Sequence, residues 1–372
     1  MESLAQMGLG GLRTVLAFVV VLGVLVFIHE MGHYLAARWR GIHVDRFSIG
    51  FGKALASWTD RRGTIWQVAW IPLGGYVKLH GMENPSDVTD EERAKWRDGE
   101  TFHEKPVGDR AIVVAAGPVA NFLLAAVLFA GLFVAIGQPV GTTTVGIVAE
   151  GAAADRAGIR VGDRILSLDG EAVRRFEQVQ AHIRPRAGEP VEVRLLREGR
   201  EVALTVTPDA APGATPTGRL GIGGGAQAFE PTDPFTAIGA GVAYTADVTW
   251  QTLAGIWQMI TGQRGTEDIG GPVKIAQLAG QAAGLGLAAL VSFTAILSVN
   301  LALINLFPIP VLDGGHLVFY ALEAVRGRPL PPRALEYGFR AGFALLMALF
   351  VFATWNDVGG PALFRWVGGL FG

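Results

Sequence analysis

Long apolar stretches alternate with mixed polar segments along the 372-residue chain. A helix needs about 20 mostly apolar residues to cross a bilayer. Four stretches approach or exceed this length without a charged residue: 14–28, 111–137, 285–312 and 341–355. The first of them has an apolar continuation at 34–37, and the last needs the apolar residues 337–339 to reach across. The pattern therefore predicts a polytopic α-helical membrane protein with four transmembrane helices.

Residues 64–78 (TIWQVAWIPLGGYVK) form a shorter apolar segment that is strand-like in character and is broken by Pro72 and by the pair Gly74-Gly75. A strand exposed to lipid would leave backbone groups without hydrogen-bond partners. We therefore expect this segment to line a protein or water-filled cavity. A buried β-rich loop that packs against the spans is the alternative.

An inserted β-rich domain is predicted at 138–208. Residues 142–149 alternate like a strand, and two further strands at 191–196 and 201–207 flank a Glu198-Gly199 turn, while 176–183 has a helical pattern. The run AGIRVGDRILSLDG, which begins at Ala157, resembles the core of PDZ domains. Such domains bind peptides by adding a strand to a sheet edge.

The following region, 209–284, is predicted to contain a linker and an amphipathic helix. Residues 208–218 (PDAAPGATPTG) have the composition of a linker. Trp250, Leu253, Trp257 and Ile260 then recur at helical spacing. Tryptophans on one face favour a helix that lies on the membrane surface, and an ordinary core-packing face is the equal alternative.

The composition agrees with a chain that is part lipid-embedded and part water-soluble. Charged residues make up 17% of the chain, against about 25% in soluble proteins. The net charge of −2 and the lack of a long basic run argue against a nucleic-acid partner. The chain has no cysteine, which excludes disulfide scaffolds, thiol nucleophiles, cysteine-bound zinc and iron–sulfur clusters.

Basic residues that flank the spans predict the orientation. They gather in 38–62, after the first span, and in 326–340, between the third and the fourth. Because cytoplasmic loops carry an excess of Lys and Arg, we expect both loops to be cytoplasmic, and the two termini and 138–284 to lie outside. We expect the first span to be retained rather than cleaved as a signal peptide, because it lacks a basic leading region.

The predicted organisation is then a first transmembrane helix at 1–37, a cytoplasmic loop at 38–110 and a second helix at 111–137. The inserted domain at 138–208 and the linker region at 209–284 follow. A third helix at 285–314 precedes a cytoplasmic loop, a fourth helix and a tail at 315–372.

The first span ends in His29-Glu30-Met31-Gly32-His33, which matches H-E-x-x-H. Two histidines four residues apart lie on the same face of a helix and can hold one Zn²⁺. Glu30 lies between them and can act as general base on the metal-activated water. Ionisable groups at the end of an apolar helix are costly and point to function. The alternative is that these groups are solvated where the helix emerges.

Zinc needs a third protein ligand in a catalytic site, and Asp313 is the strongest candidate. The extended motif of soluble metalloproteases fails here, because Ala36 and Trp39 occupy the expected glycine and histidine positions. Asp313 lies in the segment NLFPIPVLDGGH, and the predicted orientation places it at the same membrane face as the two histidines. An Asp-Gly turn in water is the alternative. His316, at the end of this segment, is more simply an exposed histidine than a partner of a ligand.

H-E-x-x-H in a first span and N-x-x-P-x-P-x-L-D-G in a later one resemble the site-2 protease family of intramembrane zinc metalloproteases, most closely its bacterial sigma-E regulatory branch. The sequence Gly117-Pro-Val-Ala-Asn121 in the second span adds to the likeness. The resemblance implies a Zn²⁺ cofactor, with His29, His33 and Asp313 as ligands and Glu30 as the catalytic base.

The resemblance also implies how substrate binds. Asn300 and Asn305 match family asparagines that help to bind substrate or water, although each amide could equally join two helices. Segment 64–78 would be a membrane-associated β-hairpin that pairs with extended substrate. The chain departs from the best-known enterobacterial member by having one PDZ-like signature rather than two, which puts a paired PDZ filter in doubt.

We therefore expect an intramembrane zinc metalloprotease that cleaves single-span membrane proteins, of the anti-sigma factor type and including remnant signal peptides. Its expected location is the bacterial inner membrane, with the PDZ-like domain periplasmic and the active site near the cytoplasmic face. The expected partners are the transmembrane substrate, a peptide or protein ligand of the PDZ-like domain, and the lipid bilayer. A metal or ion transporter and an inactive PDZ membrane scaffold are the alternatives.

Overall fold

The computed structural model describes residues 2–82, 88–89, 91, 94, 96–211, 217–225, 227–263, 265 and 270–359. The chain divides into two compact units. Unit 1 comprises Met1–Ala130 and Ile238–Gly372, and unit 2 comprises Gly131–Ala237. The predicted site residues all belong to unit 1.

Four helices of the described residues are long and apolar enough to cross a membrane: α1 (Glu2–Trp39), α3 (Val107–Ile136), α8 (Leu287–Leu306) and α10 (Pro332–Asp357). Each of them overlaps one of the four predicted spans. Large apolar side chains such as Val20 and Leu123 are exposed on them, which is the surface that a lipid environment would cover.

The third span is shorter than the sequence suggested. The expected helix at 285–314 is wrong at its C-terminal end, because α8 stops at Leu306 and Phe307 is extended. A proline at 308 disfavours helical backbone in the residue before it. A second helix, α9 (Asp313–Arg326), begins at Asp313, so the start of the expected loop after 314 is helical.

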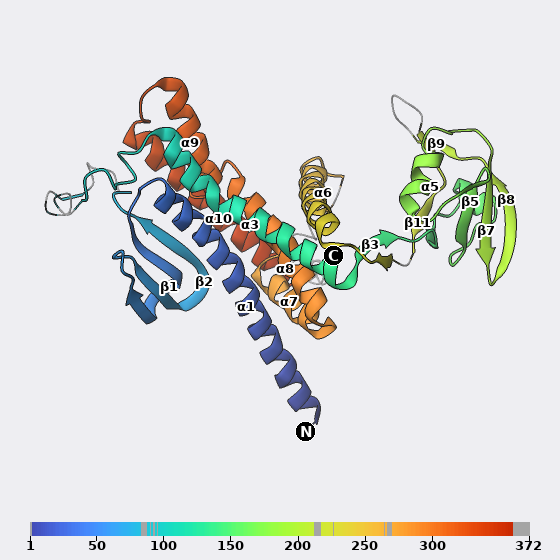
Figure 1. Ribbon diagram of the computed structural model, residues 1–372, viewed down its shortest axis with the longest axis horizontal. Coiled ribbons are helices and arrows are strands. Elements are labelled where there is room, and N and C mark those ends of the chain that lie inside the picture. Colours follow the sequence, from blue (N-terminus) through green and yellow to red (C-terminus); the bar gives the residue numbers. More distant parts are fainter. Residues whose placement is uncertain are drawn as a thin grey trace, which may run out of the picture. The chain divides into compact units, whose positions relative to one another are not determined.

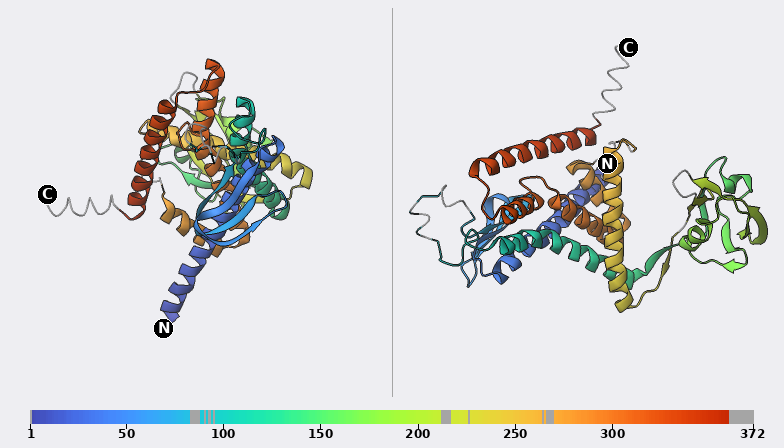
Figure 2. Two further views of the ribbon diagram at one scale, coloured as in Figure 1. Left: turned by 90° about the vertical axis from the view of Figure 1, so that its left-hand side faces the viewer. Right: turned by 90° about the horizontal axis from the view of Figure 1, so that it is seen from above.

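Two long strands, β1 (Val44–Thr59) and β2 (Ile65–Leu79), lie beside the C-terminal half of α1 (Figures 1 and 2). Each strand bends so that its two halves pair with the same part of the other strand. Trp66 lies opposite both Phe47 and Trp58, and Phe47 lies opposite both Trp66 and Val77. The rings of Phe47 and Trp66, which lie opposite each other, are also stacked. The strand predicted at 64–78 is therefore present.

The two ends of β1 differ in burial. The first half belongs to a core in which Phe47 is fully buried, whereas the second half, from Phe51 onward, is exposed. Gly50 allows the bend between them: its φ is +86°, and a Cβ there would lie 2.7 Å from the backbone oxygen of Ile71. The buried half of β1 thus packs against the helices, and the exposed half projects from them.

Unit 2 is built on a sheet of β5 (Arg164–Leu168), β6 (Glu171–Ala172), β7 (Val191–Arg197) and β8 (Arg200–Val206), in the order β6-β5-β7-β8. The short helices α4 (Ala153–Arg156) and α5 (Phe176–Ile183) accompany it. Alternate residues of β7 are buried in one core, as the period of the strand predicts.

The predicted end of the inserted domain at 208 is wrong. Strands β11 (Ile222–Gly224) and β12 (Gln227–Glu230) return to pair with β4 (Val145–Val148) and β3 (Gln138–Gly141). Strands β9 (Asp209–Ala211) and β10 (Thr217–Arg219) also pair with each other. The linker composition of 208–218 therefore marks a connection inside the unit rather than its end.

Two helices precede α8. In α6 (Pro234–Ile260), Trp250, Trp257 and Ile260 are exposed, so the apolar face does not pack inside the described chain. Helix α7 (Pro272–Leu285) packs against α1, and a Cβ at its Gly280 would collide with Thr14. The region predicted as linker and amphipathic helix thus contains two helices.

An ion pair in unit 2 joins the last residue of β7, Arg197, to the buried Asp163 that immediately precedes β5. Arg197 donates from Nε and Nη2 to the two carboxylate oxygens of Asp163, at 2.8 and 2.7 Å, and the backbone N–H of Arg160 adds a third bond. The Asp163 side chain is 2% exposed. Burial alone would raise the pKa of Asp163, but the hydrogen bonds from Arg197 and Arg160 hold that pKa below its ordinary value.

We predict that Arg197→Gln destabilises unit 2 by about 2–3 kcal/mol, because a buried carboxylate loses its paired charge. Hydrogen exchange on the full chain in detergent would show faster exchange in β5 and β7. Because the native pKa of Asp163 is depressed, the pair contributes stability above the unfolded-state pKa of about 3.9 and loses it as pH falls through the native value. The effect of the substitution should therefore shrink below about pH 4.

Arg194→Gln is the matched control. Arg194 is on the same strand, and its ion pair with Glu192 has both side chains at least half exposed, so its loss should change stability by less than about 1 kcal/mol. Equal effects of the two substitutions would contradict the assignment.

Candidate metal centre

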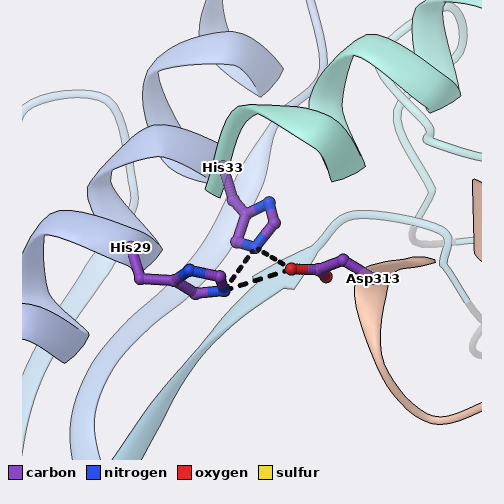
Figure 3. Close-up of side chains that lie close together, drawn as sticks. All are labelled: His29, His33 and Asp313. Carbon is purple, nitrogen blue, oxygen red and sulfur yellow. Dashed lines mark hydrogen bonds and ion pairs between the residues drawn. The ribbon is translucent and has the colours of Figure 1, made fainter. Parts of the chain in front are cut away.

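Three predicted side chains meet at one point (Figure 3). The Nε2 atoms of His29 and His33 are 3.2 Å apart. Asp313 Oδ2 lies 3.2 Å from the first and 3.5 Å from the second. The three side chains are 10%, 13% and 17% exposed. They form the one group of three or more potential ligand side chains found within the described residues.

The spacing of these atoms fits a zinc ion. Tetrahedral zinc with bonds of about 2.0–2.1 Å has ligand atoms roughly 3.3 Å apart, and the three observed separations lie between 3.2 and 3.5 Å. Asp313 Oδ2 is buried and makes no regular hydrogen bond within the described residues. Three ligands of this type would leave one coordination position for water or substrate.

Helix α1 places the two histidines by its period alone, since residues four apart share a face. Helix α3 lies against that face at Gly117. A Cβ at this position would come within 2.3 Å of His33 Nε2 and 2.9 Å of His29 Cε1. Only glycine therefore lets α3 approach the two rings this closely. The ring of His33 is further oriented by its Nδ1, which lies 2.8 Å from the backbone oxygen of Val113 and donates to it.

A glycine pair brings Asp313 to the histidines. After α8 ends, the chain makes a turn and enters α9 at Asp313. A Cβ at Gly314 would lie 2.2 Å from the backbone oxygen of Leu306, and one at Gly315 would lie 2.3 Å from that of Ile309. The two glycines thus let the first turn of α9 fold back on the end of α8.

Glu30 lies between the α1 histidines and β2. A Cβ at Gly75 of β2 would be 3.2 Å from Glu30 Cγ, and the backbone of Val77 faces the carboxylate. Both histidines and Asp313 are close enough to interact with its charge. The helix and the β-sheet together therefore hold a carboxylate next to the ligand cluster.

The other residues singled out in the sequence lie on α8 and α9. Asn300 Oδ1 accepts a hydrogen bond of 3.2 Å from Thr252 on α6, so this amide joins two helices. Asn305 is half-buried in the last turn of α8 and has no side-chain hydrogen bond within the described residues. His316 packs against the rings of Tyr320 and Phe339 and lines a cavity of about 270 Å³.

Sequence reasoning gave no individual role to the residues of α3 that contact the histidines. Gly117 and Asn121 were noted as part of one motif, and Val113 was not noted. The local signal was a glycine and an amide one turn apart in a charge-free span. Such a pattern does not show which other helix the glycine and the amide face.

Residues 17–349 match the family model described as Peptidase family M50. The "Putative zinc metalloprotease R01501" of Rhizobium meliloti is 43% identical over 359 residues, covering 93% of this chain and 96% of its own. Metalloprotease MmpA of Caulobacter vibrioides is 39% identical over 396 residues, covering 98% and 100%. Among solved structures, the PDZ domain of the SdrC-like protein from Listeria innocua is 21% identical, covers 25% of this chain and all of its own, and has a TM-score of 0.21.

We predict that Asp313→Asn removes most of the bound zinc, because an amide keeps the shape of the side chain but loses the charge that balances the metal. Zinc per chain, measured by mass spectrometry of metals on detergent-purified protein, should fall well below the wild-type value. His316→Gln, one turn further along α9, should retain wild-type zinc. Full zinc in Asp313→Asn would exclude this aspartate as a ligand.

We also predict that Gly117→Ala lowers zinc affinity by at least about tenfold, because its methyl group would displace the His33 ring. The affinity is measured by competition with a chromogenic chelator. Gly131→Ala is the control on the same helix, since a Cβ at Gly131 meets nothing within 4 Å. Equal zinc affinities in the two alanine variants would show that zinc binding does not need the close approach of α3 to the histidine rings.

Proposed function

This chain belongs to peptidase family M50, the site-2 protease family, and is a multi-pass membrane metalloprotease; we propose that it cleaves peptide bonds inside the transmembrane segments of single-span membrane proteins. The observation that carries the proposal is the convergence of His29, His33 and Asp313 beside Glu30, three of them in the C-terminal half of the apolar helix α1 and the fourth at the start of α9. Ionisable groups are kept in such places for function.

His29, His33 and Asp313 would hold Zn²⁺, the cofactor named for the curated relatives. When bound there, zinc would supply a Lewis acid that polarises a scissile carbonyl and would lower the pKa of a bound water far below that of bulk water, toward about 7. Glu30 then takes the proton from the attacking water and delivers it to the leaving amine. The packing of Glu30 against β2 supports this role, because it holds the carboxylate on the side of the cluster where the sheet lies.

The β1–β2 sheet would hold the substrate in an extended form. A protease must expose a peptide bond that a transmembrane helix hides in its hydrogen-bonded backbone. An open sheet edge can bind the unwound segment through main-chain hydrogen bonds. Gly75 and Val77 of β2 have a strand neighbour on one side, in β1, and Glu30 lies near both. A strand added near this edge would bring its peptide groups close to the ligand cluster.

We further propose the orientation and substrates that the sequence predicts. The loop after α1 and the segment between α9 and α10 would face the cytoplasm of a bacterium, with unit 2 in the periplasm as a PDZ-like peptide-binding domain. The basic residues of those loops support this orientation. A cluster at the C-terminal end of α1 then lies near the cytoplasmic face. Cleavage there would release a cytoplasmic fragment, as expected for substrates of the anti-sigma factor type or for remnant signal peptides.

The proposal is tested by cleavage of a model single-span substrate in proteoliposomes. Glu30→Gln should lower the rate by about 10²–10⁴-fold, because it removes the group that transfers the proton. Zinc content should stay at the wild-type level, since Glu30 is not a ligand. The proposal is wrong if both proteins cleave equally, or if neither cleaves while zinc is bound.

A further inference from the structure

Asn121 is a fully buried amide at the ligand cluster to which the chemistry above gives no task. It lies one turn beyond Gly117 on α3 and is 0% exposed. Its Nδ2 lies 3.3 Å from His29 Nδ1. Its backbone oxygen accepts a separate hydrogen bond of 2.8 Å from Ser298 of α8. The contact with Ser298 therefore does not depend on the side chain of Asn121.

The tautomer of His29 decides what its Nδ1 needs. The Nε2 of His29 faces His33 and Asp313, so Nε2 is the atom available to a metal. A neutral imidazole that binds a metal through Nε2 carries its proton on Nδ1. That Nδ1–H must donate to an acceptor, and an amide nitrogen cannot accept.

Asn121 holds the missing acceptor. Its Oδ1 is buried and has no hydrogen-bond partner within the described residues. Rotation of the amide by 180° exchanges two groups of nearly equal size. It would place Oδ1 where Nδ2 now stands, so that Oδ1 accepts from His29 Nδ1–H. One rotation thus removes both the orphaned oxygen and the mismatched contact.

His33 already has the equivalent arrangement. Its Nδ1 donates to the backbone oxygen of Val113 at 2.8 Å, so in a neutral ring Nε2 is the unprotonated atom, and it is directed at Asp313. Val113, Gly117 and Asn121 recur every four residues, so they share one face of α3. This face supplies an acceptor to each histidine, and Gly117 provides the close approach between them.

We propose that Asn121 is a positioning residue that accepts the Nδ1–H of His29 and so fixes the tautomer and the ring plane in which His29 binds zinc. This inference rests on the proposed function, because it takes His29, His33 and Asp313 as the zinc ligands. Partners of this kind usually change metal affinity by 10–100-fold.

The test is zinc affinity of the full-length protein in detergent, measured by chelator competition. Asn121→Leu keeps the volume but removes the acceptor, and zinc should bind about 10–100-fold more weakly. Asn121→Asp keeps an acceptor oxygen at the same place and should bind zinc at least as tightly as wild type. Ser298→Ala is the matched control, because it removes a contact to the Asn121 backbone without touching the ring, and its affinity should stay at the wild-type value.

The absorption spectrum of the cobalt-substituted protein gives a second readout, because it reports the geometry of the ligands directly. It should change in Asn121→Leu and remain that of wild type in Asn121→Asp. A merely structural role of Asn121 would leave zinc affinity and spectrum unchanged in both variants. If Asn121→Leu does not fold, Asn121→Asp still decides, since weak zinc binding in this acceptor-retaining variant would overturn the inference.

Failure of this inference is distinguishable from failure of the proposed function. If wild type binds no zinc, or binds it equally after Asp313→Asn, the ligand assignment itself is wrong. If wild type binds zinc through Asp313 and Asn121→Leu binds it equally tightly, the ligands stand and only the role of Asn121 is excluded.

Discussion

The structure of unit 1 depends on the cost of placing polar groups inside apolar helices. An imidazole or a carboxylate without a partner in such surroundings is strongly unfavourable. His29 and His33 are therefore tolerated on α1 only because other elements bring complementary groups to them. Asp313 faces their Nε2 atoms, and α3 presents polar groups to their Nδ1 atoms. The positions of α3 and α9 follow from this requirement.

Close packing makes these contacts possible, and glycine makes the packing possible. Gly117 lets α3 touch both imidazole rings, and Gly314 and Gly315 let α9 fold back on α8. At Gly117 the missing side chain leaves room for the two imidazole rings, and at Gly314 and Gly315 it leaves room for the backbone that connects α8 to α9. The glycines therefore belong to the candidate metal centre even though none of them can bind a metal through a side chain.

The parts of the fold that depend on local pattern could be predicted from the sequence. The four spans follow from uninterrupted apolar stretches, and the histidine pair follows from the period of the helix. The parts that depend on distant contacts could not. The end of α8 at Leu306 was missed because apolar composition continues past the helix. The pairing of β11 and β12 within unit 2 was not predicted because a strand partner roughly 75–90 residues away leaves no local trace in the sequence. The bond from Thr252 to Asn300 was invisible for the same reason.

The candidate site also contains one part that local pattern predicts and another part that depends on distant contacts. His29, His33 and Glu30 lie within five consecutive residues, and one helix presents them together. Asp313 could be connected to them through the predicted orientation of the spans and through the family resemblance, and neither of these is an argument about packing. Because the proposed ligands come from α1 and α9 and the groups that face their Nδ1 atoms come from α3, no single element contains the complete candidate centre. Metal affinity should therefore be coupled to the packing of all three helices. A substitution such as Gly117→Ala changes none of the proposed ligands, and we expect it to weaken metal binding for this reason.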